Sequence, residues 1–177
     1  MRTFWICGLP RSRTAWLSVL LTQQDSFCFH EISLQVIGMD ALELRMRGTG
    51  YPIVGVSEPS LLLQWEEITS RFPDAQWILI ERDPKESLAA FQKLFPEYPE
   101  SFQVDLVRRM EDMTKFMSTE CLHVPYAKLD DFNTCELIVQ RCTGHGLNRE
   151  RFRLLNSLNI SQNVPKVMRE LATVEVS

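Results

Sequence analysis

Several features that mark common classes of protein are missing from this sequence. Its five cysteines form no C-x-x-C pair and no Cys/His cluster with the spacing of a metal site. No apolar run approaches the length that spans a bilayer. Pro10, Arg11 and Arg13 interrupt the apolar N-terminal run that a signal peptide would need. These absences predict a reduced, cytoplasmic protein with no membrane segment and no bound metal.

An excess of basic residues is also missing. The formal net charge is −4 at pH 7, which argues against broad binding to nucleic acid, because such binding needs a basic surface. A local basic patch within an acidic protein remains compatible with this charge. The chain has 177 residues and shows no internal repeat or linker. We therefore expect one domain, residues 1–177, with a sizeable core and a small molecule as its partner.

Short apolar runs alternate with amphipathic segments along most of the chain. Runs rich in β-branched and aromatic residues predict strands, and apolar residues at helical spacing predict the helices between them. This alternation favours an α/β fold with a mostly parallel, five-stranded sheet covered on both faces. The predicted strands are 3–9, 26–31, 52–56, 76–81 and 121–125, and the predicted helices are 15–23, 33–46, 60–72, 85–95, 100–117, 131–143 and 148–156. The segment that follows them looks irregular or weakly helical.

The turn between the first predicted strand and the first predicted helix is crowded with polar residues. Arg11, Ser12, Arg13 and Thr14 follow one another directly after Gly8-Leu9-Pro10. Ligands of parallel α/β sheets bind beyond the carboxyl ends of the strands, and the N–H groups at a helix N-terminus attract anions. Guanidinium groups add charge and forked hydrogen bonds to phosphate or sulfate oxygens. The turn therefore favours an anion site over a helix that is only capped by serine.

The same turn lacks the lysine of a nucleoside-triphosphate-binding loop. The Walker A pattern G-x-x-x-x-G-K-[ST] requires that lysine next to its second glycine. Here the residue five places after Gly8 is Arg13, and no lysine lies in the loop. A nucleoside triphosphatase is therefore disfavoured.

Three segments of the chain carry a family resemblance. G-L-P-R-S-R-T-A-W is similar to a Pro-[Lys/Arg]-Ser-Gly-Thr-x-[Trp/Leu] loop, and W-I-L-I-E-R-D-P-K-E-S-L-A-A-F is similar to a strand-Arg-[Asn/Asp]-Pro-helix segment. A weaker likeness, V-P-Y-A-K-L-D-D-F, follows them in the same order. Together they resemble the sulfotransferases that use 3′-phosphoadenosine-5′-phosphosulfate (PAPS). The resemblance implies a three-layer α/β/α sandwich of the P-loop NTPase-like kind, PAPS as co-substrate, and no metal.

The resemblance also implies roles for individual residues. Arg11 corresponds to the basic residue near the bridging oxygen of the donor. Arg13 replaces the usual glycine, which either narrows the loop or adds an anion contact. Arg82 corresponds to the arginine that binds the 3′-phosphate. The family's serine eight residues later is Ala90 here, so Ser87 is the substitute. The implied donor-binding residues are Arg11, Ser12, Arg13, Thr14, Ala15, Trp16, Arg82 and Ser87.

Three residues are candidates for the base that takes the acceptor's proton. Ser57 corresponds to a histidine of cytosolic family members, and Glu58 beside it is an alternative that also suits a helix cap. Trehalose-type sulfotransferases use a glutamate after the second strand, which corresponds to Glu31. The resemblance implies Glu31 and Arg11 as catalytic residues, and a desolvated Glu31 would have a raised pKa. Strand alternation places His30 on the opposite side, in a structural role.

Three functions follow from these observations. The first is sulfuryl transfer from PAPS to a hydroxyl or amine of a small acceptor. The second is a P-loop nucleotide kinase-like enzyme, which the loop without lysine disfavours. The third is a catalytically inactive, sulfotransferase-like binding protein, which Ser57 and Ala90 favour because each replaces a family residue.

Overall fold

The computed structural model describes residues 1–117 and 121–158. Five strands form one sheet in the order β2-β3-β1-β4-β5, and each neighbouring pair is parallel. The predicted α/β fold with a parallel five-stranded sheet is therefore confirmed. The strands are β1 (Arg2–Gly8), β2 (Ser26–Phe29), β3 (Ile53–Ser57), β4 (Gln76–Glu81) and β5 (Cys121–Pro125).

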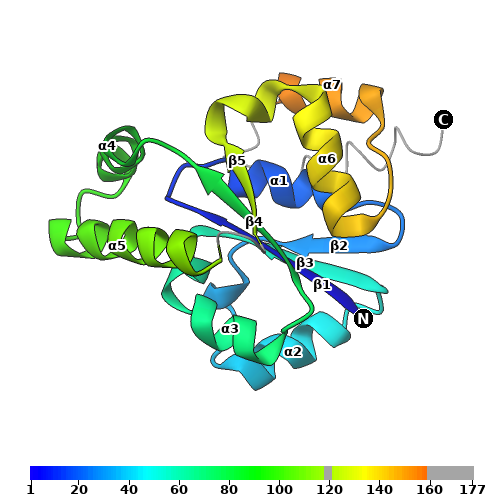
Figure 1. The fold of residues 1–177 in the computed structure, drawn as a ribbon, viewed down its shortest axis with the longest axis horizontal. Helices are drawn as coiled ribbons and strands as arrows, with labels where there is room; N and C mark the ends of the chain where they lie inside the picture. The colour runs from blue at the N-terminus through cyan, green and yellow to red at the C-terminus, as the bar shows by residue number, and fades with distance from the viewer. Residues whose placement is uncertain (118–120, 159–177) are drawn as a thin grey trace.

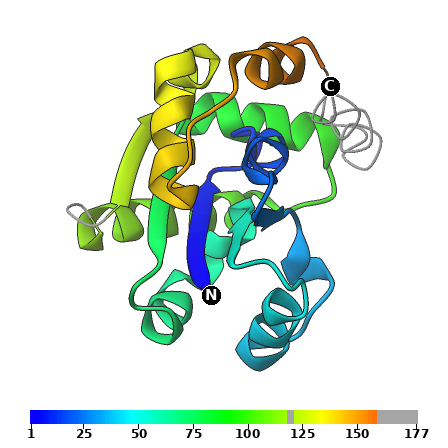
Figure 2. The ribbon, with the colours of Figure 1, turned by 90° about the vertical axis from the view of Figure 1, so that its right-hand side faces the viewer.

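Helices cover both faces of the sheet and complete a three-layer α/β/α arrangement (Figure 1). The helices are α1 (Thr14–Leu21), α2 (Met39–Arg47), α3 (Trp65–Arg71), α4 (Pro84–Leu94), α5 (Glu100–Phe116), α6 (Phe132–Thr143) and α7 (Arg149–Ser157), with 3₁₀ turns η1 (Ile32–Leu34), η2 (Pro59–Leu63) and η3 (Tyr126–Asp130). One face carries α1, α6 and α7, and the other carries α2, α3 and α5. Figure 2 shows these two layers from the end at which β1 begins.

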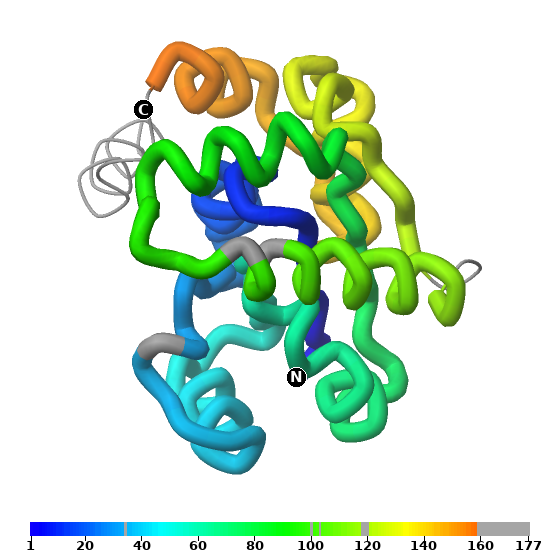
Figure 3. Tube along the Cα trace, turned by 90° about the vertical axis from the view of Figure 1, so that its left-hand side faces the viewer, coloured from blue at the N-terminus to red at the C-terminus, as the bar shows by residue number. Residues whose placement is uncertain are grey.

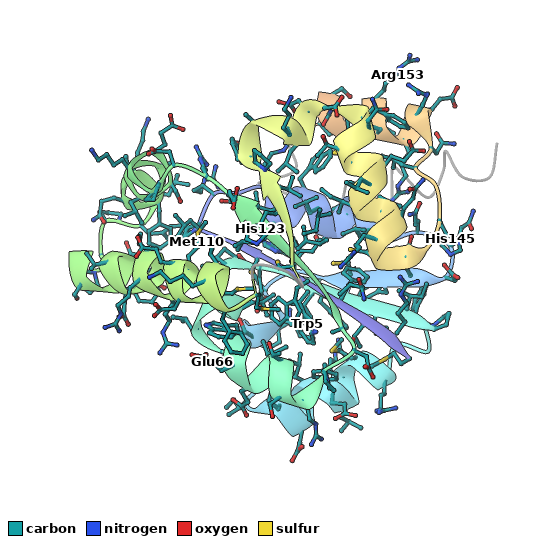
Figure 4. The ribbon with its side chains drawn as sticks, in the orientation of Figure 1. Trp5, Glu66, Met110, His123, His145 and Arg153 are labelled. Atoms are coloured by element: carbon teal, nitrogen blue, oxygen red, sulfur yellow. The ribbon has the colours of Figure 1, made fainter. Side chains whose placement is uncertain are left out.

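The central strand β1 contributes side chains to both halves of the core. Phe4 and Ile6 pack in the apolar cluster beneath α1, α6 and α7, whereas Trp5 and Cys7 pack in the cluster on the other face. Burial on both faces explains why β1 is apolar at almost every position. Each large apolar side chain buried in this way contributes roughly 1.5–3 kcal/mol to folding. Trp5, which Figure 4 labels on the α3 side of the sheet, lies in the core.

The boundaries of three predicted elements are wrong. The predicted helix 33–46 is divided into η1 and α2, because Gly38 adopts a φ of 84° between them. The predicted helix 60–72 is divided into η2 and α3, with Gln64 outside the helical region at φ −134°. The second strand ends at Phe29 rather than at residue 31, because Glu31 adopts a φ of 56°, which a strand cannot accommodate. The last dozen or so residues, which are predicted to be irregular or weakly helical, lie outside the described residues.

The strand order produces a crevice where β1 and β4 end. After β1 the chain passes through α1 to β2, on one side of β1, and after β4 it passes toward β5, on the other side. Neighbouring strands whose connections leave in opposite directions form the place where open α/β sheets bind ligands. Figure 3 views the molecule from this end, where α4 lies beside the loop that follows β1.

Candidate functional site

A cavity of about 480 Å³ opens at this crevice. Its volume lies in the range of small-molecule sites, roughly 300–1,000 Å³. The loops after β1, β2, β3 and β4 line it together with α4, η3 and the end of α7. The structure therefore brings together most of the residues that the sequence predicts as functional. Those that line the cavity are Arg11, Arg13, Thr14, Ala15, Trp16, Glu31 and Arg82.

The segment after β4 holds the loop after β1 through two hydrogen bonds. Arg82 donates from Nη1 to the carbonyl oxygen of Arg11, and Ser87 donates from Oγ to the carbonyl oxygen of Pro10. The guanidinium of Arg82 also lies over the ring of Tyr126, 4.3 Å from its centroid. The two segments with the clearest family resemblance therefore meet at one cavity.

Backbone strain is concentrated at this cavity. Arg11, Arg13 and Glu31 all line it, and all have left-handed backbone conformations, with φ values of 68°, 60° and 56°. A side chain other than glycine costs roughly 1–2 kcal/mol in this conformation. Gln24 is the one other such residue in the part of the chain that the structure describes. Strain that gathers around one cavity indicates a functional constraint on the shape of its loops.

The first turn of α1 presents backbone N–H groups at the cavity. The N–H of Leu17 donates to the carbonyl oxygen of Arg13 at 2.9 Å, so the N–H groups of Thr14, Ala15 and Trp16 precede the first intrahelical bond. None of the described side chains caps this end of the helix. Free N–H groups together with the positive end of the helix dipole attract an anion.

The two loop arginines have different surroundings. Arg11 is exposed and forms no ion pair with any of the described residues. Arg13 instead donates to Asp130 at 2.6 Å and to Asn156 at 2.9 Å, and its guanidinium lies 4.2 Å from the ring centroid of Trp16. Arg11 is therefore available to a ligand, whereas Arg13 joins α1 to η3 and α7 in place of the predicted anion contact.

The resemblance implies that Ser12 and Ser87 bind the PAPS donor, but neither residue lines the cavity. Ser12 is 0% exposed, and its Oγ has no hydrogen-bond partner among the described residues. Ser87 is also buried, and its hydroxyl is used by Pro10. Ala90, eight residues after Arg82, does line the cavity. Helix α4 thus presents a methyl group where the resemblance has a hydroxyl.

Aromatic side chains form part of the cavity wall. Trp16, Phe91, Phe95 and Tyr126 all line it, and the rings of Phe91 and Phe95 lie 5.1 Å apart. The indole N–H of Trp16 donates to the carbonyl oxygen of Leu155 at 3.1 Å, which fixes that ring against α7. Aromatic faces of this kind suit a flat ring in the ligand.

Neither Ser57 nor Glu58 faces the cavity. The hydroxyl of Ser57 donates to the carbonyl oxygen of Thr14 at 2.9 Å and so holds the start of α1. The carboxylate of Glu58 is buried, and one of its oxygens accepts a hydrogen bond of 2.6 Å from Ser60. Both residues therefore support the loops rather than a reaction within the cavity.

Glu31 and His30 both line the cavity. Two predictions about them are corrected: that the Glu31 carboxylate is desolvated, and that His30 points to the opposite side. The side chain of Glu31 is 60% exposed, so the expected desolvation of its carboxylate is absent. The prediction that His30 points to the opposite side is wrong, because β2 ends at Phe29 and the left-handed Glu31 turns the chain. His30 Nδ1 lies 2.6 Å from the carbonyl oxygen of Ser57, and its Nε2 lies 3.5 Å from Glu31 Oε1. The sequence does not predict His30 at the cavity, because it does not show that the second strand ends at Phe29.

The other two histidines lie elsewhere. His145 bonds to Asp25 at 2.8 Å at the end of the molecule opposite α4, and His123 on β5 bonds to Glu81 at 2.8 Å (Figure 4). Among residues 1–117 and 121–158, no group of three or more His, Cys, Asp or Glu side chains is placed to hold a metal ion. In that same part of the chain, no helix has the length and apolar character needed to cross a membrane.

Comparison with family models and with curated proteins identifies no relative. A scan against protein-family models finds no matching family, and a search of curated proteins finds no match. A functional proposal for this chain therefore depends on its own residues and on the geometry of the cavity.

Proposed function

We propose that the protein is a sulfotransferase that moves a sulfuryl group from PAPS to a hydroxyl or amine of a small acceptor. The observation that carries this proposal is the meeting of Arg11 and Arg82 at one cavity, beside the uncapped first turn of α1. These two arginines belong to the two segments with the clearest resemblance to PAPS-dependent enzymes. PAPS has two anionic groups, the 5′-phosphosulfate and the 3′-phosphate, and Arg11 and Arg82 provide one cation for each.

The residues around the cavity divide the work of binding the donor. The N–H groups of Thr14 and Ala15 and the guanidinium of Arg11 would hold the phosphosulfate. Arg82 would bind the 3′-phosphate, and the aromatic side chains in the cavity wall would pack against adenine. Cationic and N–H groups that are fixed before the reaction stabilise the charge that develops as the sulfur–oxygen bond breaks. We therefore propose that Arg11 stabilises the negative charge that develops in the transition state.

Transfer to a hydroxyl also requires a proton acceptor. Three titratable groups other than arginine line the cavity: the Glu31 carboxylate, the His30 imidazole and the Tyr126 phenol, whose ring lies against the Arg82 guanidinium. Glu31 is the base that the resemblance implies, and its exposed carboxylate is accessible to an acceptor molecule.

A second function, donor binding without catalysis, is favoured by two observations. Ala90 lines the cavity where the resemblance has a serine, and the Ser57 hydroxyl is engaged by Thr14. A protein of this kind would bind the nucleotide but form no sulfated product. A nucleotide kinase-like activity is the third possibility, and the loop still lacks the lysine that it needs.

Isothermal titration with adenosine 3′,5′-bisphosphate, the product of the donor, tests the proposal. We expect binding that weakens tenfold or more in Arg11→Ala and in Arg82→Ala, since a charge-assisted hydrogen bond contributes about 1.5–3 kcal/mol. Arg82→Ala should also reduce the preference for the bisphosphate over adenosine 5′-monophosphate, which lacks the 3′-phosphate. Arg153→Ala is the matched control, because Arg153 is exposed on α7 away from α4 (Figure 4).

Each of the other functions gives a different result in these titrations. No heat at millimolar bisphosphate would contradict donor binding altogether. Magnesium-dependent binding of ATP in place of the bisphosphate would favour a kinase-like enzyme. Bisphosphate binding without sulfated product from labelled PAPS, over a panel of alcohols, phenols and amines, would select the inactive binding protein.

A further inference from the structure

The imidazole of His30 is held in one tautomer. Its Nδ1 lies 2.6 Å from the carbonyl oxygen of Ser57, and a carbonyl oxygen only accepts hydrogen bonds, so Nδ1 carries the proton. In the neutral ring, Nε2 then has a free lone pair. Fixing one ring nitrogen on a backbone carbonyl is what prepares the other to accept a proton.

Ser57 also sets the position of this imidazole relative to the anion-binding turn. Its carbonyl oxygen accepts from His30, and its hydroxyl donates to the carbonyl oxygen of Thr14 at 2.9 Å. One buried residue at the end of β3 thus links the ring to the first turn of α1. The side chain of His30 is 17% exposed, and it lines the same cavity as Arg11.

Nε2 of His30 lies beside the carboxylate of Glu31. Glu31 Oε1 lies 3.5 Å from Nε2 and becomes its ion-pair partner when the ring is charged. The cations that share the cavity oppose that charge, and the anionic groups of the donor offset them. The charged groups that line this cavity or lie beside Ser57 are Glu31, Arg11, Arg13, Arg82 and the buried Glu58.

We propose that His30 is the proton acceptor of the transfer reaction and that Glu31 is a positioning residue. This inference rests on the proposed function. As the acceptor oxygen attacks sulfur, His30 Nε2 takes the hydroxyl proton. The bond between sulfur and the bridging oxygen breaks, and its electron pair leaves on adenosine 3′,5′-bisphosphate. The proton then passes from Nε2 to solvent, and the step requires no other reactant.

Hydrolysis of PAPS tests the proposal, because water is itself a hydroxyl acceptor and the natural acceptor need not be known. His30→Asn is the decisive variant, since its amide N–H can still donate to the Ser57 carbonyl but no group replaces Nε2. We expect hydrolysis to fall by about 10²–10⁴-fold, the usual contribution of a general base, and its pH dependence to disappear. Glu31→Gln should be slower by about tenfold and keep the pH dependence, because the imidazole remains.

Nitrogen NMR of the histidine rings provides a second readout that does not depend on turnover. The chain has three histidines, and the ring signal that is absent from the spectrum of His30→Asn belongs to His30. We expect the neutral His30 ring to be protonated at Nδ1, because that nitrogen bonds the Ser57 carbonyl oxygen, both with and without adenosine 3′,5′-bisphosphate.

The outcomes separate this inference from the function on which it rests. Bisphosphate that fails to bind wild-type protein contradicts the proposed function. Bisphosphate that binds to a protein whose neutral His30 ring is protonated at Nε2 contradicts the role of His30. Hydrolysis that is equal in wild type and His30→Asn also contradicts that role, whereas hydrolysis that is no faster in wild type than without protein contradicts the proposed sulfuryl transfer. Unchanged bisphosphate affinity in His30→Asn, together with slow hydrolysis, supports the role of His30.

Discussion

Arg11 and Arg13 are separated by one residue, yet they have different roles in the structure. Both adopt left-handed backbone conformations, but Arg11 extends into solvent at the cavity while Arg13 pairs with Asp130 and Asn156. Asp130 precedes α6, and Asn156 lies near the end of α7. The sequence predicts an anion contact for both arginines, because neighbours this distant along the chain cannot be recognised without the fold.

At the same scale, Ser12→Ala is expected to separate stability from ligand binding. The Ser12 hydroxyl is buried without a partner, and such a group costs about 1–3 kcal/mol, so its removal should leave the free energy of unfolding unchanged or raise it. Ser12 does not line the cavity, so affinity for adenosine 3′,5′-bisphosphate should stay unchanged. Urea denaturation measures the stability of the variant, and titration calorimetry measures its affinity.

Ser26→Ala is the matched control for this change. Its hydroxyl is equally buried, but it donates to the carbonyl oxygens of Leu21 and Gln23 at 2.7 and 3.1 Å. We expect a loss of about 1 kcal/mol in stability and no change in affinity. A tenfold loss of affinity in Ser12→Ala but not in Ser26→Ala would contradict this expectation, because it would mean that the Ser12 hydroxyl contacts the bound nucleotide.

At the scale of an element, Asp131 caps helix α6. Its carboxylate accepts hydrogen bonds from the Thr134 hydroxyl at 2.8 Å and from the Thr134 N–H at 2.9 Å. These two bonds, the hydroxyl first, hold the pKa of Asp131 below its usual value. A lowered pKa in the folded state means that the cap stabilises the fold above the ordinary titration range of aspartate. This contribution is lost as the pH falls through the folded value.

Asp131→Ala should therefore lower the free energy of unfolding at pH 7, and the difference from wild type should shrink at pH 3. Urea denaturation at both pH values measures it. Glu111→Ala, which removes an exposed carboxylate from α5, is the control and should change stability little at either pH. A difference for Asp131→Ala that stays constant with pH would rule out the capping carboxylate as its cause.

The position at which β2 ends determines which of its last residues face the cavity and so are candidates for the base. The run SFCFHE predicts one strand that continues through residue 31, in which His30 and Glu31 alternate sides. In the structure the strand stops at Phe29, and both residues line the cavity. A single left-handed residue after the strand is a local backbone choice that apolar periodicity does not report.

At the scale of the whole molecule, the five cysteines are divided between the two halves of the core, so their reactivity can show whether each half is folded. Cys7 and Cys121 lie in the cluster beside α3 and α5, and Cys28, Cys135 and Cys142 lie in the cluster beneath α1 and α6. All five are free and buried. Desolvation raises the pKa of Cys121 and of Cys135 to about 12, far from the range in which a thiolate forms at neutral pH.

We expect the native protein to resist iodoacetamide at pH 8 and all five thiols to react together when urea unfolds the sheet. Mass spectrometry of partly unfolded samples would then show unlabelled and fully labelled chains with little between them. Early labelling confined to Cys28, Cys135 and Cys142 would contradict this, since it would mean that one helical layer opens without the other.

The sequence by itself determined the parallel α/β fold and the position of the polar turn between β1 and α1. These depend on periodicity and on residue types that are local along the chain. Only the tertiary structure decided which polar side chains face the cavity. Arg82 and Ser87 reach the loop after β1 across more than 70 residues of sequence, and His30 meets Ser57 across 27. Such partners are fixed by the strand order and by backbone turns, because these set the direction in which each side chain points.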